Sequence, residues 1–193
     1  MEGRTISRDL MDSVLEISFL EDKIGLSRLN SPTVLDIGAG YGRLGHRAAS
    51  ALGRGHILCT DGVAVSTFLC DYYLSFRGVA GAETVPLDEV ELALGRCRID
   101  VAVNVHGLEE CPAQVASWWI ELLARHQVPW VFFVSTSDAP QSRERSGERL
   151  PLGPIFSSHG FQQALREPKY LHSKTVQELG VYPAHYFLFS RQT

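Results

Sequence analysis

Four glycines follow an acidic residue in a short stretch near residue 40. The stretch reads VLDIGAGYGRLG, in which Asp36 precedes the glycines Gly38, Gly40, Gly42 and Gly45. Glycine lets the backbone approach a ligand where a Cβ atom would collide, and a carboxylate at the end of a buried strand suits a ligand that carries a positive charge. The stretch therefore predicts a loop that binds a small molecule, although a tight turn between a strand and a helix could use the same glycines.

Two glycine patterns fit this stretch. Read from Gly40, it contains GxGxxG, the fingerprint of dinucleotide-binding folds. Read from Asp36, it is an acid-x-Gly-x-Gly-x-Gly pattern that ends at Gly42. We favour the second pattern because the position of Asp36 is normally apolar in dinucleotide folds, and because 193 residues leave little room for a catalytic domain beside a full dinucleotide-binding domain. A dinucleotide oxidoreductase stays an alternative, which NAD binding would reveal.

Polar residues also follow two later apolar segments. Asp61 comes at the distance from the glycines where an acid can hydrogen-bond ribose hydroxyls, or it caps a helix. Residues 104–110 read NVHGLEE. His106 is the candidate general base because imidazole exchanges protons near neutral pH; contact with a ligand and a structural role are the alternatives. Glu109 and Glu110 are the next candidates for the general base. An acid at the start of a helix is also stabilised there by the helix dipole, so either residue could have no catalytic role.

The elements that must position these residues alternate along the chain. Apolar spacing predicts helices at Ser7–Ile24, Arg43–Leu52, Val65–Phe76, Leu87–Gly95, Ala113–His126 and Leu152–Gly160. Strands are predicted at Thr33–Ile37, His56–Cys59, Thr84–Leu87, Ile99–Val103, Pro129–Val134, Phe161–Glu167 and Ala184–Arg191. This alternation predicts an α/β doubly wound sheet, with ligands at the carboxyl ends of its strands. We expect a single domain over residues 1–193.

Several details of these elements matter for the site. The first helix is expected to bury the face made by Leu10, Val14, Ile17, Leu20 and Ile24. Trp118 and Trp119 are expected to be core residues rather than a platform for a sugar. Thr136–Pro151 is polar and predicts a loop, and the segment Ser135–Arg149 is either solvated and mobile or a lid that closes over the acceptor or donor.

The composition argues against several classes of partner. The net charge is −4 without a dense Lys/Arg block, which counts against nucleic acid. No apolar run reaches the roughly 20 residues of a membrane span, and the polar N-terminus is unlike a secretory signal. The four cysteines form no CxxC pair, which favours a reducing compartment. We therefore expect a cytoplasmic protein that binds neither nucleic acid nor membrane, and we leave a homodimer open.

The glycine segment DIGAGYGR, followed by Asp61, resembles the first motif of class I S-adenosylmethionine (SAM)-dependent methyltransferases. The segments TISRDLMDSVLEISFL, DYYL, NVHGLEECP and EPKYL…GVYPAHYFLF extend the resemblance to the bacterial sugar O-methyltransferase group, over about Thr5 to Arg191. The resemblance implies a Rossmann-like sheet of seven strands in the order 3-2-1-4-5-7-6, with strand 7 antiparallel. It also implies methyl transfer from SAM to a hydroxyl of a sugar or other small molecule, which leaves S-adenosylhomocysteine (SAH).

The resemblance assigns roles to residues one by one. Asp36 would orient the loop or contact the amino group of SAM. Asp61 would hydrogen-bond the ribose hydroxyls. Asp88 would accept a hydrogen bond from the adenine amine, unless it caps a helix. The residues expected to bind the cofactor are Asp36, Gly38, Ala39, Gly40, Tyr41, Gly42, Asp61, Gly62, Asp88, Asn104 and Val105, and the catalytic candidates are His106 and Glu109. The NVHG segment departs from the Asn/Asp-Pro-Pro-aromatic motif of amino-group methyltransferases, which disfavours N-methylation.

Other assignments stay open at this stage. Tyr41 either covers the ligand or packs on the first helix, and the position of Arg43 at a helix start suggests a carboxylate partner from protein or ligand. Asp138 could join Glu109 and Glu110 in part of a magnesium site, but no compact metal motif appears and no metal ligand is assigned. A second function is a methyltransferase-fold binding module that needs a partner subunit, because the segment before the glycine motif supplies only one helix.

Overall fold

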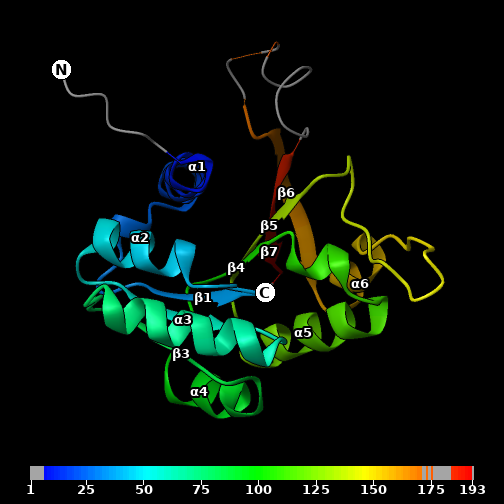
Figure 1. Ribbon diagram of the computed structural model, residues 1–193. Coiled ribbons are helices and arrows are strands. Elements are labelled where there is room, and N and C mark those ends of the chain that lie inside the picture. Colours follow the sequence, from blue (N-terminus) through cyan, green and yellow to red (C-terminus); the bar gives the residue numbers. More distant parts are fainter. Residues whose placement is uncertain (1–6, 171–172, 174, 176–183, 193) are drawn as a thin grey trace.

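Seven strands form one mixed sheet (Figure 1). The computed structural model describes residues 7–170, 173, 175 and 184–192. The strands are β1 Thr33–Ile37, β2 His56–Thr60, β3 Ala82–Thr84, β4 Val101–Val105, β5 Trp130–Ser135, β6 Phe161–Pro168 and β7 His185–Arg191. Their order is β3-β2-β1-β4-β5-β7-β6, with β1 to β5 parallel and β7 antiparallel to both neighbours. The expected α/β fold and strand order are confirmed.

The α-helices are α1 Arg8–Ile24, α2 Arg43–Leu52, α3 Ala64–Phe76, α4 Val90–Arg96, α5 Ala113–Arg125 and α6 Gly153–Ser158. Helix α1 precedes the first strand, and the other α-helices lie between successive strands. The predicted first helix is confirmed, since the Ser7 side chain accepts the Leu10 amide and Gly25 ends the helix in the left-handed conformation. No helix in the part of the chain that the structure describes is both long and apolar enough to cross a bilayer.

The two faces of the sheet bury separate apolar cores because successive strand residues point to opposite sides. Residues of α1, α2 and α3 pack with Val34, Val103 and Phe132 on one face. Residues of α4, α5 and α6 pack with Leu35, Ala102 and Phe133 on the other. The strands between them are held rigidly on both sides, so the loops at their carboxyl ends stand on a fixed base.

Two predicted strands are displaced. β3 ends at Thr84 rather than beginning there, because Pro86 lacks an amide donor and residues 87–89 turn into a 3-10 helix. β4 begins at Val101 instead of two residues earlier, since the Asp100 carboxylate accepts the Thr33 amide at 2.9 Å and starts the pairing with β1. The shift of β4 matters for function, because Asn104 and Val105 become the last residues of the strand.

The buried face of α1 also differs from the prediction. Leu10 and Val14 are exposed, and the residues that face inward are Asp12, Ser13, Glu16, Phe19 and Leu20. The acids turn inward because each forms an ion pair there: Glu16 with the partly buried Arg43 of α2, and Asp12 with the buried Lys169 just after β6. Leu20 is buried as expected, and Ile17 and Ile24 pack against the same core. The apolar spacing therefore located the helix and part of its inward face, but not the polar part near its N-terminus.

Candidate active site

A large cavity opens at the carboxyl ends of β1, β2 and β4. Its volume is about 1080 Å³. The predicted site residues that line it are Gly38, Gly40, Asp61, Gly62, Asp88, Asn104, Val105 and His106. A smaller cavity of about 210 Å³ shares several of these residues and adds Asp36, Ala39, Tyr41 and Arg43 to its walls. The fold thus gathers almost all of the predicted residues around two adjoining spaces.

The glycine loop after β1, residues 38–42, is closely packed at one glycine and open at another. Gly42 has φ +82°, and a Cβ atom there would come within 2.8 Å of the Cys70 sulfur, so the turn into α2 needs glycine at this position. By contrast, no atom lies within 4 Å of the place where Gly40 would carry a Cβ. The backbone at Gly40 is therefore open toward the cavity, as a loop that meets a ligand requires.

Asp61 joins the glycine loop to the loop after β2. Its carboxylate accepts the amide of Gly40 at 3.0 Å and that of Val63 at 2.8 Å. Each carboxylate oxygen can accept a second hydrogen bond, and Asp61 lines the large cavity. The residue can accordingly hold the loop and still accept hydroxyl groups of a ligand.

Asp36 is a buried acid beside the small cavity. The residue is 2% exposed, and its Oδ2 has no hydrogen-bond partner within the described structure. Burial raises the pKa of Asp36 to about 7, against the opposing charge of Arg43, while Glu16, Cys70 and Asp61 add to the rise. An unpaired buried carboxylate is costly unless something compensates it, so this position is suited to a cationic or hydrogen-bond-donating ligand group.

Asn104 holds two loops together. Its Nδ2 donates to the Ile37 carbonyl oxygen at 2.8 Å, and its Oδ1 accepts the Leu108 amide at 2.9 Å. The neighbouring Gly107 approaches the glycine loop so closely that a Cβ atom would lie 3.6 Å from the Gly38 Cα and 2.9 Å from Asn104 Nδ2. Asn104 was predicted to contact the ligand; it borders the cavity, but both ends of its amide connect the loops after β1 and β4.

His106 borders both cavities and pairs with Glu109. The Nδ1 atom of His106 lies 3.0 Å from Oε1 of Glu109, and the backbone of His106 is left-handed, with φ +65°. Such a conformation is strained in a residue other than glycine and is often found at functional sites. The ring's Nε2 has no hydrogen-bond partner among the described residues.

Glu109 is fully occupied by hydrogen bonds. It is 5% exposed and accepts from the Ser135 hydroxyl at 2.6 Å and from the Thr136 amide and hydroxyl at 3.2 and 3.1 Å. Burial alone would raise its pKa, but the bonds from His106, Ser135 and Thr136 hold the pKa below its usual value. Glu109 does not line either cavity, so it is placed to orient His106 and not to take a proton from a ligand.

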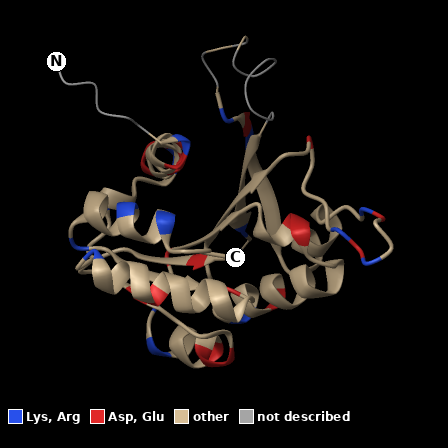
Figure 2. Ribbon diagram, in the orientation of Figure 1, with Lys and Arg blue, Asp and Glu red and all other residues tan. Residues whose placement is uncertain are grey.

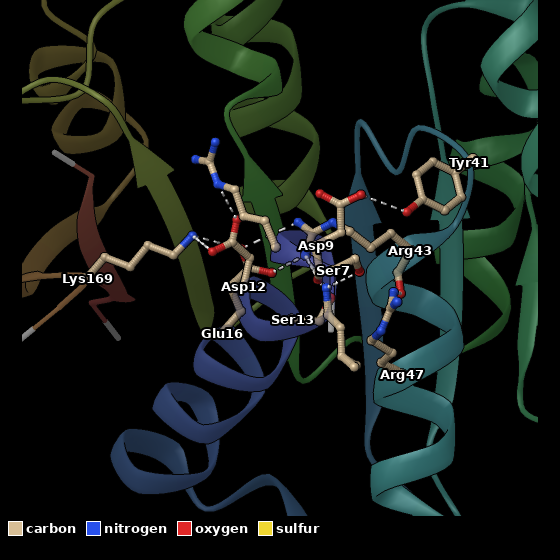
Figure 3. Close-up of polar contacts among 11 residues, drawn as sticks. Ser7, Asp9, Asp12, Ser13, Glu16, Tyr41, Arg43, Arg47 and Lys169 are labelled. Atoms are coloured by element: carbon tan, nitrogen blue, oxygen red, sulfur yellow. Dashed lines mark hydrogen bonds and ion pairs between the residues drawn. The ribbon is translucent and has the colours of Figure 1, made fainter. Parts of the chain in front are cut away.

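The residues after the glycine loop bind to α1 (Figure 3). Arg43 Nη1 donates to Glu16 Oε2 at 2.9 Å and to the Ser13 hydroxyl at 2.7 Å, and burial raises the pKa of Glu16 against this pairing. The expected carboxylate partner of Arg43 therefore comes from the protein. The Tyr41 hydroxyl donates to Asp9 at 3.2 Å, which confirms the interpretation that Tyr41 packs on the first helix.

The structure also bears on four interpretations that the sequence left open or only partly resolved. Trp119 is a core residue as expected, at 5% exposed, whereas Trp118 is 39% exposed; both border the large cavity. Asp138 pairs with Arg166 at 2.6 Å rather than joining Glu109 and Glu110. Asp88 is exposed at the cavity and makes no helix-capping bond in the described structure. Within residues 7–170, 173, 175 and 184–192, no three His, Cys, Asp or Glu side chains gather as metal ligands.

Sequence reasoning missed three participants, Glu16, Ser135 and Thr136. Ser135 and Thr136 carried a usable signal, since they stand at the carboxyl end of β5, where ligands and their supporting residues collect. Glu16 carried none, because its burial depends on where Arg43 lies in space.

The comparisons with known proteins agree with this geometry at the level of the fold. No protein-family model and no curated protein matches the sequence. Magnesium protoporphyrin IX methyltransferase (ChlM) from Synechocystis PCC 6803 with bound SAM is 14% identical and covers 98% of this chain and 86% of its own, with a TM-score of 0.60. The mitomycin 7-O-methyltransferase MmcR is 13% identical over 95% of this chain and 54% of its own, with a TM-score of 0.66.

A third similar structure is that of an enzyme named for a different reaction. The [4+2]-cyclase SpnF is 14% identical and covers all (100%) of this chain and 86% of its own, with a TM-score of 0.68. Identities this low establish the fold alone. The chain thus has the Rossmann-like fold of class I methyltransferases, and the activity has to be argued from its own residues.

Proposed function

We propose that the protein is a SAM-dependent methyltransferase that methylates a hydroxyl group of a small-molecule acceptor, with a sugar as the expected acceptor class. The observation that carries the proposal is the His106–Glu109 pair, which stands where the two cavities meet beside the glycine loop. A base at this place suits a reaction in which a neutral hydroxyl must lose a proton. The sugar class rests on the sequence resemblance.

The residues of the site fit SAM as donor. The unpaired Oδ2 of Asp36 offers a partner for the ammonium group of its methionine part. Asp61 has remaining acceptor capacity for ribose hydroxyls, and the apolar side chains of Val63, Leu87 and Leu108 line the same cavity, as the flat adenine ring requires. ChlM, a protein of the same fold, was crystallised with SAM and with SAH.

In the proposed reaction SAM, His106 and Glu109 have separate roles. When bound, SAM supplies a methyl group activated by a sulfonium charge. Because Glu109 can only accept, Nδ1 of His106 carries its hydrogen toward Glu109, and the neutral ring therefore presents the lone pair of Nε2. Nε2 is the proposed acceptor of the hydroxyl proton. Glu109 would stabilise the imidazolium that forms and fix the ring's orientation.

A binding module without transfer activity is the second candidate. The fold does not by itself require methyl transfer, since the cyclase SpnF shares it. Such a module would bind SAM or SAH but would give no methylated product with any acceptor, or would do so only with another subunit present. Turnover by the isolated chain with one acceptor would exclude it.

Calorimetric binding tests the donor assignment first. SAM, SAH and NAD are titrated into the wild type and into Asp61→Ala, with Glu110→Ala as the matched control at the same cavity. We expect SAM and SAH to bind at micromolar level, NAD not to bind, and Asp61→Ala to weaken binding at least 10-fold because ribose contacts and the support of Gly40 are lost together. NAD binding without SAM binding would replace the proposal by an oxidoreductase.

A further inference from the structure

The outer face of α3 is an exposed apolar strip. The strip, as we define it, consists of Val65, Phe68, Leu69, Tyr72 and Phe76. Its three aromatic side chains are 67%, 61% and 73% exposed. They form a ladder in which Phe68 stacks on Tyr72 at 6.5 Å and Tyr72 stacks on Phe76 at 6.2 Å between ring centroids. Exposed apolar surface that is continuous in this way marks an interaction site in most soluble proteins.

The helix is apolar on both sides. Cys70 and Leu74 face the core and are 1% and 4% exposed, while the five residues of the strip occupy about 100° of the opposite circumference. Asp71 is the one charged residue of α3, and the helical repeat places it beside the strip rather than in it. Figure 2 shows α3 almost entirely in tan. A helix that is hydrophobic all round is normally covered.

We infer that this strip is the interface of a homodimer, in which α3 of one copy packs against α3 of a second copy. The spacing of the rings favours a second copy as the occupant. Tyr72 lies at the centre, four residues from Phe68 and four from Phe76. A two-fold axis at Tyr72 brings Phe68 of one copy against the partner's Phe76, and the reverse, so the strip is complementary to itself.

Charge and area agree with this occupant. The strip carries no charge, so two copies meet without repulsion, whereas a charged docking segment of another protein would find no counter-charge. At about 200 Å² for each aromatic side chain, and with each about two thirds exposed, the three rings expose roughly 400 Å² per copy. That is about half of the approximately 800 Å² that each partner buries in a standard interface, so the rings form the centre of the contact and the residues around them complete it. Rows of side chains four residues apart also interlock well between two helices.

The interface goes beyond the proposed methyl transfer and does not depend on it.

Sedimentation of the full chain tests the inference, over concentrations from about 1 to 100 μM. We expect a dimer for the wild type and a monomer for Tyr72→Asp. Met11→Asp is the matched control, since Met11 is 50% exposed on α1, and it should stay dimeric. Circular dichroism checks that each variant is folded, and the milder Phe68→Ser replaces Tyr72→Asp if the latter unfolds.

Cross-linking adds geometry to the test. Because Tyr72 is placed on the two-fold axis, Tyr72→Cys should give a covalent dimer under mild oxidation, well above the wild-type background, while Val14→Cys on α1 should not. A wild type that stays monomeric throughout would overturn the inference. So would a dimer that persists in folded Tyr72→Asp or that is lost in Met11→Asp. None of these measurements uses SAM, so their failure is separate from a failure of the proposed activity.

Discussion

The Nδ1 atom of His106 and the Oε1 atom of Glu109 lie 3.0 Å apart, and the same carboxylate accepts the hydroxyl of Ser135 at 2.6 Å. Glu109 is thus held from the end of β5, while His106 is held from the end of β4. A side chain whose partner is itself fixed has little freedom to rotate. This arrangement supports a histidine that is oriented before any acceptor arrives.

The pair predicts graded losses of activity. His106→Ala should lower kcat by about 100- to 10,000-fold, because the base is removed. Glu109→Gln should lower kcat by about 10- to 100-fold with KM almost unchanged, because only the orientation and tautomer of His106 are affected. Steady-state kinetics with a converted acceptor measures both. Glu110→Gln is the comparison, since a larger loss there than in His106→Ala would move the base to Glu110.

Asp36 predicts opposite pH dependences for donor binding and for stability. Its ionised form is the partner proposed for the ammonium of SAM, so affinity should fall about 10-fold for each pH unit below about 7 and level off above it. Calorimetry between pH 5.5 and pH 8.5, a range of about 1.5 units either side of 7, measures the slope. Asp36→Asn should bind weakly with a flat profile; a slope that survives in this variant would assign the titration to another group.

The raised pKa of Asp36 also determines whether the stability of the ligand-free protein rises or falls with pH. A carboxyl whose folded pKa is raised from its ordinary 3.8 to about 7 stabilises the fold fully below the lower value. That contribution is lost as the pH rises through about 7, and it amounts to about 4 kcal/mol at most. Urea unfolding without SAM should show declining stability across this range, and Asp36→Asn should remove the decline.

The buried pair of Arg43 and Glu16 predicts a stability effect that depends on which partner is removed. Arg43→Met should cost about 3–5 kcal/mol, since among the described residues the fully buried Glu16 would keep Lys169, at 3.8 Å, as its one cationic partner. Adding Glu16→Gln should restore part of this loss, because no uncompensated charge remains. Arg125→Met is the control: its pair with Glu91 is equally short at 2.7 Å but exposed, so the cost should stay within about 1 kcal/mol. Additive losses in the double variant would contradict the pairing argument.

The sequence predicted the parts of this molecule that depend on local pattern. Alternating apolar segments located the sheet and its helices, and the acid before the glycines located the loop beside Asp36. The start of β4 could not be predicted from local sequence pattern. It depends on a hydrogen bond between Asp100 and Thr33, which lie far apart in the chain.

The assignment of roles within the site needed three dimensions. Glu109 was a candidate base in the sequence, but its burial and its bonds to Ser135 and Thr136 make it a support for His106. Asn104 borders the cavity as expected, and the nitrogen and oxygen of its side-chain amide also join two loops, a second role that its residue type alone does not reveal. Residue type and spacing show which groups are near a site, whereas their hydrogen bonds show which of them remain available to react.

The position of β7 has a consequence for how the chain matures. β7 follows β6 in sequence, yet it lies between β5 and β6. While the ribosome is still making the residues after Ser135, one edge of β5 has no neighbour, and at about 5–20 residues per second this lasts for some seconds. During that interval Phe132 and Phe133 lie beside an open strand edge, which is a template for aggregation. Slow translation of the segment before His185 would therefore lower the yield of native protein, and a chaperone that shields β5 would raise it.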